Sequence, residues 1–387
     1  MLLRTILLLS LRFTICMNIT TKFIDSQHST FFSTLNKRVN QYFKQNNITR
    51  FGNRQMVIKT AVLLTAYLGS YLAILFLPVN PWYLLPLAIL MGVAMAGIGM
   101  SVMHDSLHGS YSANQTVNQW VGYSTYFIGA NPFVWKVQHN VFHHTYTNVH
   151  GLDEDIKTKL VLRLSRHAPL QWINRYQYVY VFFLYGFNTL FFIVSDFIKL
   201  MNYHRMGMIK QQKSALRQEL SKLIVTKILY LFFTVALPML ITPLLWWQVL
   251  IGVFAMHFTA GYILTLIFQM AHIVEEVEQP LPNAEGNIEN AWAVHQLMTT
   301  ANFARENHLL NWYVGGLNYQ VEHHLFPNIC HVHYYDISKI VEQTAKEFEL
   351  PYLVQPTFTD ALQSHVRMLK SLGDTPAHHS ETKKSAA

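Results

Sequence analysis

Hydrophobic residues fill two long stretches of the chain from which charged side chains are absent. No Lys, Arg, Asp or Glu occurs in the 44 residues from Thr60 to Met103, or in the 47 residues from Ile228 to Val274. A helix needs about 20 apolar residues to cross a bilayer, so each stretch is long enough for two crossings. The pattern predicts two helical hairpins that turn near Asn80 and Trp246, with spans at about 60–77, 82–103, 223–245 and 247–271.

Two amphipathic patterns flank this hydrophobic core. Phe31, Leu35, Val39 and Phe43 recur at helical spacing and predict a helix that lies along the membrane surface. After the last span, we expect helices near 287–310 and 337–348, the second with Asp336 as its N-cap. The predicted fold class is therefore an all-α integral membrane protein with four transmembrane helices, interfacial helices and a cytosolic helical cap that holds a di-metal site.

Composition and charge agree with a membrane protein. Hydrophobic residues make up 51% of the chain and charged residues 13%, whereas an average soluble domain has roughly 25% charged residues. The net charge of +8 comes without a basic run or an aromatic-basic alternation, so nucleic acid is not an expected partner. Lys and Arg lie before Thr60 and between Lys199 and Lys227, and neither hairpin turn carries one. Positive residues collect in cytoplasmic loops, so we expect a multi-pass protein with both termini and the active site in the cytosol.

This pattern divides the chain into three parts. Residues 1–59 form an N-terminal cytosolic or interfacial segment, 60–350 the main domain, and 351–387 a C-terminal helix followed by a disordered tail from Gly373. We expect translation to start at Met17 instead of Met1, because Arg4 and Arg12 interrupt the apolar stretch 1–16 and no small-residue cleavage site follows it. A signal peptide is the alternative.

Histidines are grouped in three short motifs, which we call the histidine boxes. The first contains His104 and His108, the second His139, His143 and His144, and the third His323 and His324. On a helix, His139 and His143 share one face, with His144 beside them. His272 ends the fourth predicted span, at the same membrane level as His104.

The uncharged residues 176–195 are long enough for a fifth span. A fifth crossing would place the first two boxes and the third on opposite sides of the bilayer, so one metal centre could not gather them. Tyr, Gln and Asn side chains also suit a lipid-facing helix poorly. We therefore expect one interfacial helix here.

The boxes indicate a centre with two metal ions. The only cysteines, Cys16 and Cys330, are far apart, which excludes a thiolate zinc site. Eight imidazoles would give about four nitrogens per ion and leave positions open, and iron with open positions is the usual choice where dioxygen is activated. The candidate ligands are His104, His108, His139, His143, His144, His272, His323 and His324. Gln320 is a further candidate, either as a weak ligand or as a residue that shapes the pocket. We expect no catalytic side chain beyond the metal centre.

The boxes resemble those of the membrane fatty-acid desaturase superfamily. The matching motifs are H-D-x-x-H at 104–108, H-N-x-x-H-H at 139–144 and Q-x-x-H-H-L-F-P at 320–327. Gln320, where most members carry His, resembles the front-end branch of delta-5 and delta-6 enzymes, which act between an existing double bond and the carboxyl end. Many eukaryotic members of that branch resemble a fusion with a cytochrome b5 domain, whose His-Pro-Gly-Gly motif is not found in this sequence. In this respect the sequence is more similar to the bacterial acyl-CoA or acyl-lipid desaturases, in particular the linoleoyl-CoA (delta-6) type, and this resemblance implies a bacterial inner membrane.

The resemblance implies a reaction as well as a fold. Two iron ions, dioxygen and two electrons from an external donor, ferredoxin or cytochrome b5, would introduce a cis double bond into an acyl chain carried by CoA or by a membrane lipid. The protein would position the chain, keep the site dry and orient the ligands. Each ligand ring needs a partner for its second nitrogen. The sequence offers Asp105, Asn140, Asp153, Glu275 and Glu322 as candidates.

Two other functions remain open at this point. A lipid hydroxylase of the same superfamily shares the boxes and differs in its product. A histidine-based metal carrier belongs to another class, but carriers place ionisable ligands near the bilayer midplane, whereas these histidines lie at helix ends.

Overall fold

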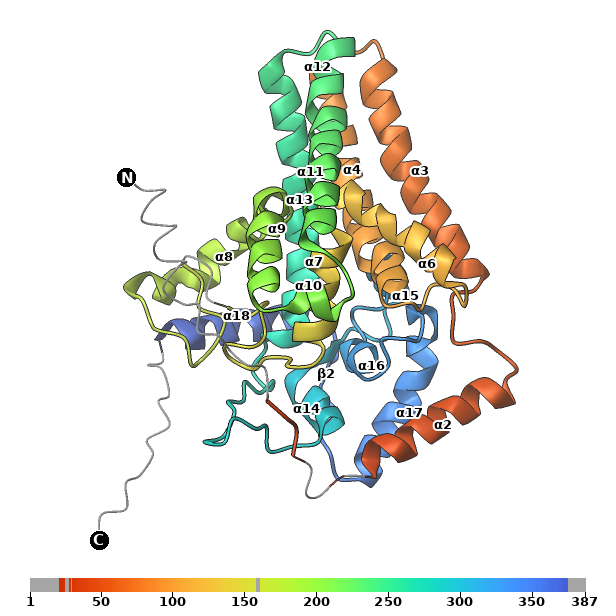
Figure 1. The fold of residues 1–387 in the computed structure, drawn as a ribbon, viewed down its shortest axis with the longest axis vertical. Coiled ribbons are helices and arrows are strands. Elements are labelled where there is room, and N and C mark those ends of the chain that lie inside the picture. The colour runs from red at the N-terminus through yellow and green to blue at the C-terminus, as the bar shows by residue number, and fades with distance from the viewer. Residues whose placement is uncertain (1–20, 25–27, 29, 158–160, 375–387) are drawn as a thin grey trace.

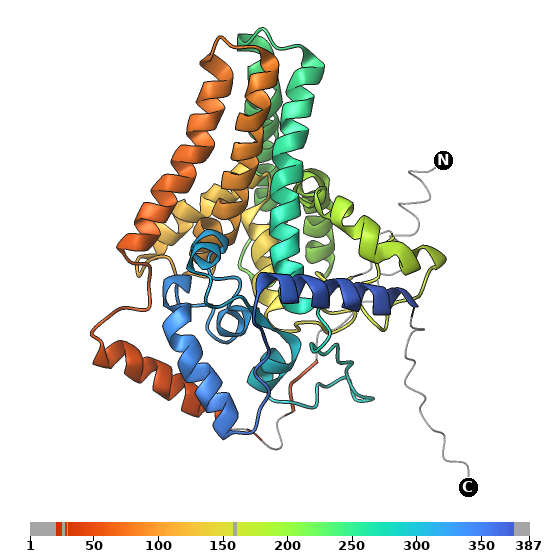
Figure 2. The same cartoon turned by 180° about the vertical axis from the view of Figure 1, so that it is seen from behind.

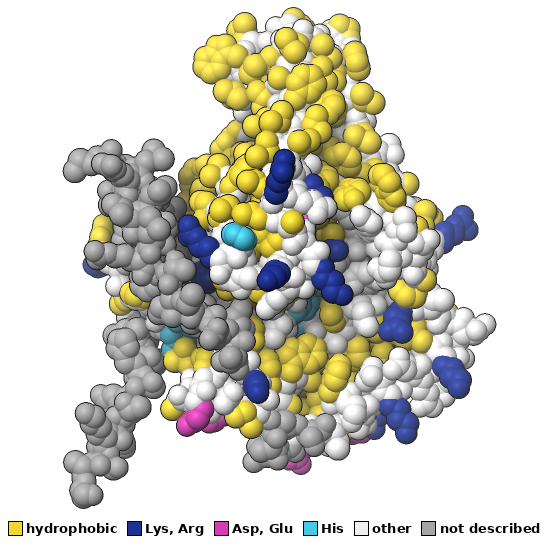
Figure 3. All heavy atoms as spheres, viewed as in Figure 1, with side chains coloured by type: hydrophobic (Ala, Val, Ile, Leu, Met, Phe, Trp, Pro, Cys, Tyr) yellow, Lys and Arg dark blue, Asp and Glu magenta, His cyan; other side chains and the backbone are white. Residues whose placement is uncertain are grey.

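Four long apolar helices stand side by side and form the upper half of the molecule in Figure 1. The computed structural model describes residues 21–24, 28, 30–157 and 161–374. The four helices run over Arg54–Phe76, Pro81–Leu107, Leu216–Ile241 and Trp246–His272, and each is long and apolar enough to cross a bilayer. Apolar side chains cover the top of the molecule in Figure 3, whereas Lys and Arg side chains lie below this apolar region. The all-α membrane fold and its two hairpins are confirmed.

Two of these helices are single α-helices, and the other two are each built from consecutive elements of different pitch. The first is α3 (Arg54–Phe76) and the last is α13 (Trp246–His272). The second is built from η1 (Pro81–Leu84), α4 (Leu85–Gly97), the π-helical turn η2 (Ile98–Met103) and α5 (His104–Leu107), and the third from α11 (Leu216–Leu231), the π-helical turn η6 (Phe232–Ala236) and α12 (Leu237–Ile241).

The second span is the centre of the bundle. In an apolar stretch of 18 residues within the second span, 67% of the residues are buried inside the protein, whereas the corresponding share is 22% in the first and third spans. Helix α4 is therefore enclosed, while α3 and α11 face outwards, where lipid would lie. Close contact between α4 and α13 depends on Gly92. A Cβ atom at Gly92 would lie 2.4 Å from the carbonyl oxygen of Met256 and 2.8 Å from Thr259 Cβ. Small residues at such positions let membrane helices approach closely.

Residues 176–195 do not form one helix, which corrects the sequence-based prediction. The 3-10 turn η5 (Trp172–Tyr176) leads into α8 (Gln177–Tyr185), and α9 (Asn188–Arg205) follows after a bend of 88°. The bend packs on α13 where Gly186, in the bend, meets Gly261 of α13. A Cβ at Gly186 would lie 2.3 Å from Phe258 Cε2, and one at Gly261 would lie 2.6 Å from the carbonyl oxygen of Gly186. The backbone of the bend therefore packs directly on the fourth span.

Short helices connect the spans and carry the second box. Between the first hairpin and η5 lie α6 (Gln115–Gly122), the 3-10 turn η3 (Tyr123–Ile128), α7 (Pro132–Lys136) and the π-helical turn η4 (Val137–His143). The small helix α10 (Met208–Gln211) joins α9 to the third span.

The C-terminal part folds under the bundle as a cap. Its elements are α14 (Trp292–Thr299), β1 (Asn302–Phe303), α15 (His308–Val314), α16 (Gln320–Leu325), η7 (His331–His333), α17 (Tyr334–Glu347), β2 (Val354–Gln355) and α18 (Phe358–Asp374). The strands pair in parallel, Asn302 with Val354 and Phe303 with Gln355. The predicted helix at 287–310 is thus two helices separated by a strand. Figure 2 shows α18 lying across the lower end of α13, where His365 Nδ1 contacts the carbonyl oxygen of Ile273 at 2.7 Å.

The amphipathic helix near residue 31 is present as α2 (Phe31–Gln45), but it does not use its apolar face on the membrane. Phe31, Leu35, Val39 and Phe43 are buried in a cluster with apolar residues of α14, α16 and α17. An ion pair of 2.6 Å between Arg38 and Glu347 adds to this contact. The helix therefore belongs to the cap.

Two boundary predictions also need correction. Asp336 lies in the first turn of α17, whose N-cap is His333, and its carboxylate accepts a hydrogen bond from the Tyr42 hydroxyl at 3.0 Å. Helix α18 continues through Gly373, where the tail was expected to begin. The predicted start at Met17 falls outside the described residues.

A pair of glycine substitutions tests the packing of the bundle. Alanine normally stabilises a helix by up to about 1 kcal/mol over glycine. We predict that Gly92→Ala will instead destabilise the protein, by about 1–3 kcal/mol, because its Cβ would collide with α13. Gly69→Ala in α3 is the matched control, since a Cβ there meets nothing within 4 Å. Thermal unfolding in detergent would measure both, and equal melting temperatures for the two variants would contradict the prediction.

Candidate metal centre

All eight predicted histidines meet at the lower end of the bundle. His104 and His108 come from the end of the second span, the second box from η4, His272 from the last residue of α13, and the third box from α16. Ring centroids lie 4.4 Å apart for His104 and His323 and 4.4 Å apart for His144 and His324. Imidazoles separated by more than two hundred residues are thus in direct contact.

The second box has a different helical pitch from the one expected. Sequence spacing suggested an α-helix, but η4 is a π-helical turn, and the backbone N–H of His144 donates to the carbonyl of His139 at 3.0 Å. A turn with i→i+5 hydrogen bonds holds more residues than an α-helical turn, so more of its side chains face the same side of the helix. As a result, His139 is close to both other members of the box, with ring centroids 5.3 Å from His143 and 4.7 Å from His144.

The histidines divide into two groups that can each hold an ion. One nitrogen atom from each of His104, His108, His139 and His323 lies within 4.8 Å of the others. The second group consists of His143, His272 and His324. His144 lies between the groups, because its nitrogens are within the same limit of His323 and His324.

The nitrogen atoms of these groups are better placed to bind a metal ion than to form hydrogen bonds with one another. In the described part of the chain, the Nε2 atoms of His108, His143 and His323 are buried and have no hydrogen-bond partner. An unpaired buried polar atom costs about 1–3 kcal/mol, so three in one place require a ligand. The Nε2 atoms of His104 and His139 face each other at 3.2 Å, as do those of His139 and His144. A cation would pair with all of these lone pairs.

The electrostatics of the site favour the metal-binding form of the rings. Burial, together with the neighbouring imidazoles, lowers the pKa values of His108, His139, His144, His323 and His324 well below the ordinary value. These rings are therefore neutral, and neutral imidazole is the form that coordinates. His143 is the exception. Burial acts to lower its pKa, but Asp153 and Asp155 raise it above the usual value.

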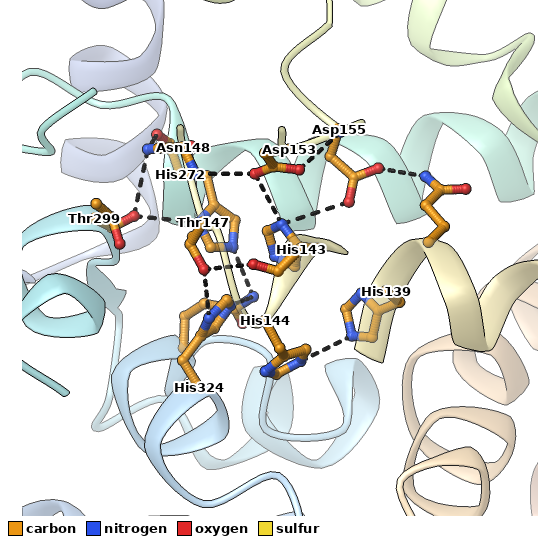
Figure 4. A network of polar contacts seen from close by, with 12 residues as sticks. His139, His143, His144, Thr147, Asn148, Asp153, Asp155, His272, Thr299 and His324 are labelled. Carbon is orange, nitrogen blue, oxygen red and sulfur yellow. Dashed lines mark hydrogen bonds and ion pairs between the residues drawn. The ribbon is translucent and has the colours of Figure 1, made fainter. Parts of the chain in front are cut away.

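Several second nitrogens are held by partners, most of which the sequence did not reveal (Figure 4). His143 Nδ1 lies 3.1 Å from Asp153 Oδ2 and 3.5 Å from Asp155 Oδ2. The remaining contacts are His324 Nδ1 to Gln296 Oε1 at 2.9 Å and to Thr147 Oγ1 at 3.1 Å, His272 Nδ1 to the Thr299 carbonyl at 3.4 Å, and His323 Nδ1 to the Tyr334 hydroxyl at 3.3 Å. Such contacts fix the orientation of a ligand ring.

Two of the five predicted partner residues lie beside a histidine of the boxes. Asp153 contacts His143 as described, and Asp105 Oδ1 lies 3.7 Å from His104 Nδ1, which is near but too long for a hydrogen bond. The other oxygen of Asp105 accepts from His331 Nδ1 at 2.8 Å and from Cys330 Sγ at 2.9 Å. Lys59 Nζ, on the far side of His331, lies 2.6 Å from its Nε2.

The side chains of the other three predicted partners, Asn140, Glu275 and Glu322, contact other parts of the protein and not the histidines of the boxes. Asn140 donates to the carbonyl of Leu107. Glu275 forms an ion pair of 2.7 Å with Arg367 on the surface. Glu322 is buried between Tyr352 and Asn302, and burial raises its pKa to about 7 despite these hydrogen bonds.

Gln320 faces the second histidine group. Its Nε2 lies 2.9 Å from His272 Nε2 and 3.5 Å from His324 Nε2, and its Oε1 is buried without a partner among the described residues. The side chain therefore occupies a place where a further ligand would stand.

Comparison with known proteins decides the family. The sequence profile described as "Fatty acid desaturase" matches residues 80–356, which include all three boxes and His272. The chain belongs to the fatty acid desaturase family. As a member of this family it is an oxidoreductase of lipid metabolism, and desaturation is favoured over hydroxylation and over metal transport.

Relatives with assigned names match most of the desaturase chain. The sn-1 linoleoyl-lipid 6-desaturase of Synechocystis is 36% identical over 356 residues, which cover 90% of this chain and 97% of the relative. The enzyme of the same name from Arthrospira platensis is 34% identical, with 89% and 93% covered. The acyl-lipid (8-3)-desaturase of Physcomitrium patens is 36% identical, with 92% of this chain and 74% of the relative covered.

Two acidic residues offer a matched test of the contacts around the histidines. We predict that Asp153→Asn will weaken iron binding about tenfold or more, because the carboxylate that orients His143 loses its charge. Glu275→Gln should leave iron affinity unchanged, since its partner is Arg367 at the surface. Competition with a chromogenic chelator on the purified protein would measure both affinities. Equal affinities in the two variants would refute the role assigned to Asp153.

Proposed function

We propose that this desaturase inserts a cis double bond into an acyl chain at a centre of two iron ions held by the eight histidines. One ion is bound by His104, His108, His139 and His323, and the other by His143, His272 and His324, with His144 between them. The observation that carries the proposal is the set of buried imidazole nitrogens without hydrogen-bond partners in the described chain, which belong to histidines whose ring nitrogens lie close together in these groups. Gln320 shapes the pocket of the second ion and is available as a weak ligand.

The reaction removes two hydrogens from adjacent methylenes and reduces dioxygen to two water molecules, with two electrons and two protons supplied from outside. Iron supplies the dioxygen chemistry when it is bound. The protein holds the rings of His108, His139, His144, His323 and His324 neutral. Asp153, Gln296, Thr299 and Tyr334 fix the orientation of His143, His324, His272 and His323. Trp135, whose ring centroid is 4.4 Å from that of His139, covers the first group and excludes water.

The proposed substrate is supported by the names of the relatives, and the proposed type of electron donor by the positive charge of the protein. The named relatives act on linoleoyl-lipid or other acyl-lipid chains, which supports an acyl chain of a membrane lipid or CoA and a delta-6-like position. We assign the supply of electrons to an external donor of the ferredoxin or cytochrome b5 type, which is what the resemblance to the desaturase superfamily implies. The excess of Lys and Arg near the centre favours an acidic donor.

Fatty-acid profiling tests the function directly. We expect the wild type, expressed in a host without polyunsaturated lipids and supplied with linoleate, to produce one new, more unsaturated acyl chain. His143→Ala should abolish the product, while His204→Ala should retain it, because His204 is an exposed histidine on α9. An oxygenated product would identify a hydroxylase instead. Product formation by His143→Ala at the wild-type rate would overturn the metal assignment.

The orientation in the membrane is a separate part of the proposal. The hairpin turns near Asn80 and Trp246 carry no Lys or Arg, whereas the ends of the spans near the histidines do. Both termini and the metal centre are therefore assigned to the cytosol. A fluorescent protein fused to the C-terminus should fluoresce, and an alkaline phosphatase fused there should be inactive. The opposite pair of results would reverse the orientation.

A further inference from the structure

A cavity of about 160 Å³ opens beside the first histidine group. His104 and His139 line one wall, and residues of α9 and α13 line the facing walls. Most of its lining is apolar, including Met100, Ile128, Phe192, Leu264 and Phe268. An acyl chain that reacts at this centre has to pass along such a surface.

The cavity also has a polar end, formed by three residues from three segments. Lys199 Nζ donates to Gln138 Oε1 at 2.5 Å, and Gln138 Nε2 donates to Asp155 Oδ1 at 2.5 Å. Asp155 Oδ2 lies 3.5 Å from His143 Nδ1. The array therefore runs from a cationic side chain on α9 to a histidine of the second group, and Gln138 holds the ammonium in place at the cavity wall.

Helix α9 sets the order of these groups along the cavity. Phe192 and Lys199 are seven residues apart on the helix, which is about 10 Å along its axis. Gln138, the partner of Lys199, immediately precedes His139 in the chain. The cationic end is therefore close to the histidines, and the apolar lining extends away from it.

This arrangement matches one end of an acyl substrate. A carbonyl oxygen of an ester or thioester accepts hydrogen bonds, and an ammonium carries three N–H donors, so Lys199 can bind a carbonyl in addition to Gln138. A charged donor makes the stronger type of hydrogen bond. A chain bound in this way presents methylenes near its carboxyl end to the histidines, while the methyl end follows the apolar wall.

The cavity is smaller than a typical pocket for a whole ligand, which is about 300–1,000 Å³. It therefore holds the part of the chain nearest the carbonyl. A second, apolar cavity of about 460 Å³ is lined by Tyr126 and Phe127, the neighbours of Ile128, together with residues of α3 and α11. The segment 126–128 thus borders both spaces, and the methyl end has room on the lipid side of it.

We propose that Lys199, held by Gln138, binds the carbonyl oxygen of the acyl substrate and thereby sets the double-bond position by its distance from the carboxyl end. This inference rests on the proposed desaturase function. Lys199 is a specificity-determining residue in this scheme, because it fixes which methylenes reach the centre.

The test compares double-bond positions in two substrates. Cells that produce the full-length protein are supplied in turn with two fatty acids that differ by two methylenes, and the products are located by mass spectrometry. The wild type should give one position in both, counted from the carboxyl end. Lys199→Met should give mixed positions, or turnover lower by about 10- to 100-fold, as expected for loss of a charged hydrogen bond. Lys199→Arg should restore the single position.

Two controls separate this role from a structural one. Lys210→Met changes an exposed lysine on α10 and should behave as the wild type. Iron content of the purified Lys199→Met protein should equal that of the wild type. Loss of iron in this variant would show that Lys199 supports the metal centre instead, and would overturn the inference.

Other results of the same experiment would contradict the role of Lys199 or the desaturase function itself. A wild-type position counted from the methyl end, or an unchanged single position and rate in Lys199→Met, would refute the role of Lys199 while leaving the desaturase function standing. Absence of any unsaturated product from the wild type would refute both. A labelled fatty-acid pulse, followed separately in the CoA and glycerolipid pools, shows which ester presents the carbonyl.

Discussion

The whole arrangement depends on the need of buried imidazole nitrogens for a partner. Burying polar atoms without hydrogen bonds is costly, and in the described chain this cost is concentrated at one end of the helical bundle. The proposed pair of cations would remove it and at the same time tie together four parts of the chain. Such a metal centre would be part of the fold, because its ligands come from the ends of the second and fourth spans, the η4 turn and the α16 helix.

A second polar cluster joins the bundle to the cap at a short distance from the histidine groups. Asp105 lies at the end of the second span, Lys59 on the first, and Cys330 and His331 in the segment that follows the third box. All four side chains are buried. A buried charge needs a partner of opposite sign and further hydrogen bonds, so this cluster is stable only when both spans and the cap are in place. It holds Asp105 beside His104 and so links the packing of α3 to the geometry of the first histidine group.

The sequence predicted the candidate site better than its surroundings. The spacing of His104, His143 and His324, together with the two uncharged stretches, was enough to predict that the boxes lie at helix ends and meet at one end of the bundle. The partners of these rings were harder to find, because Gln296 and Tyr334 are ordinary residues whose role appears only when α14 and α17 fold under the boxes. For the same reason Glu275, which is close to His272 in sequence, points to Arg367 instead. Hydrophobic patterns report which face of a helix is buried but not what covers it. They could therefore not show that α2 packs on the cap, nor that Gly186 meets Gly261 and bends the chain between α8 and α9.

The π-helical turns before and within the boxes have a consequence for how such a sequence can change over time. Each widened turn contains one residue more than the α-helix would need, and η2 ends directly before His104 while η4 contains His139 and His143. Removal of a single residue there would convert the turn to ordinary pitch and rotate every later side chain of the helix by about 100°. Apart from the ligands His139 and His143, residues in these turns can be substituted, but insertions and deletions would displace the boxes, so the number of residues in 98–103 and 137–143 is more tightly constrained than the identity of the other residues.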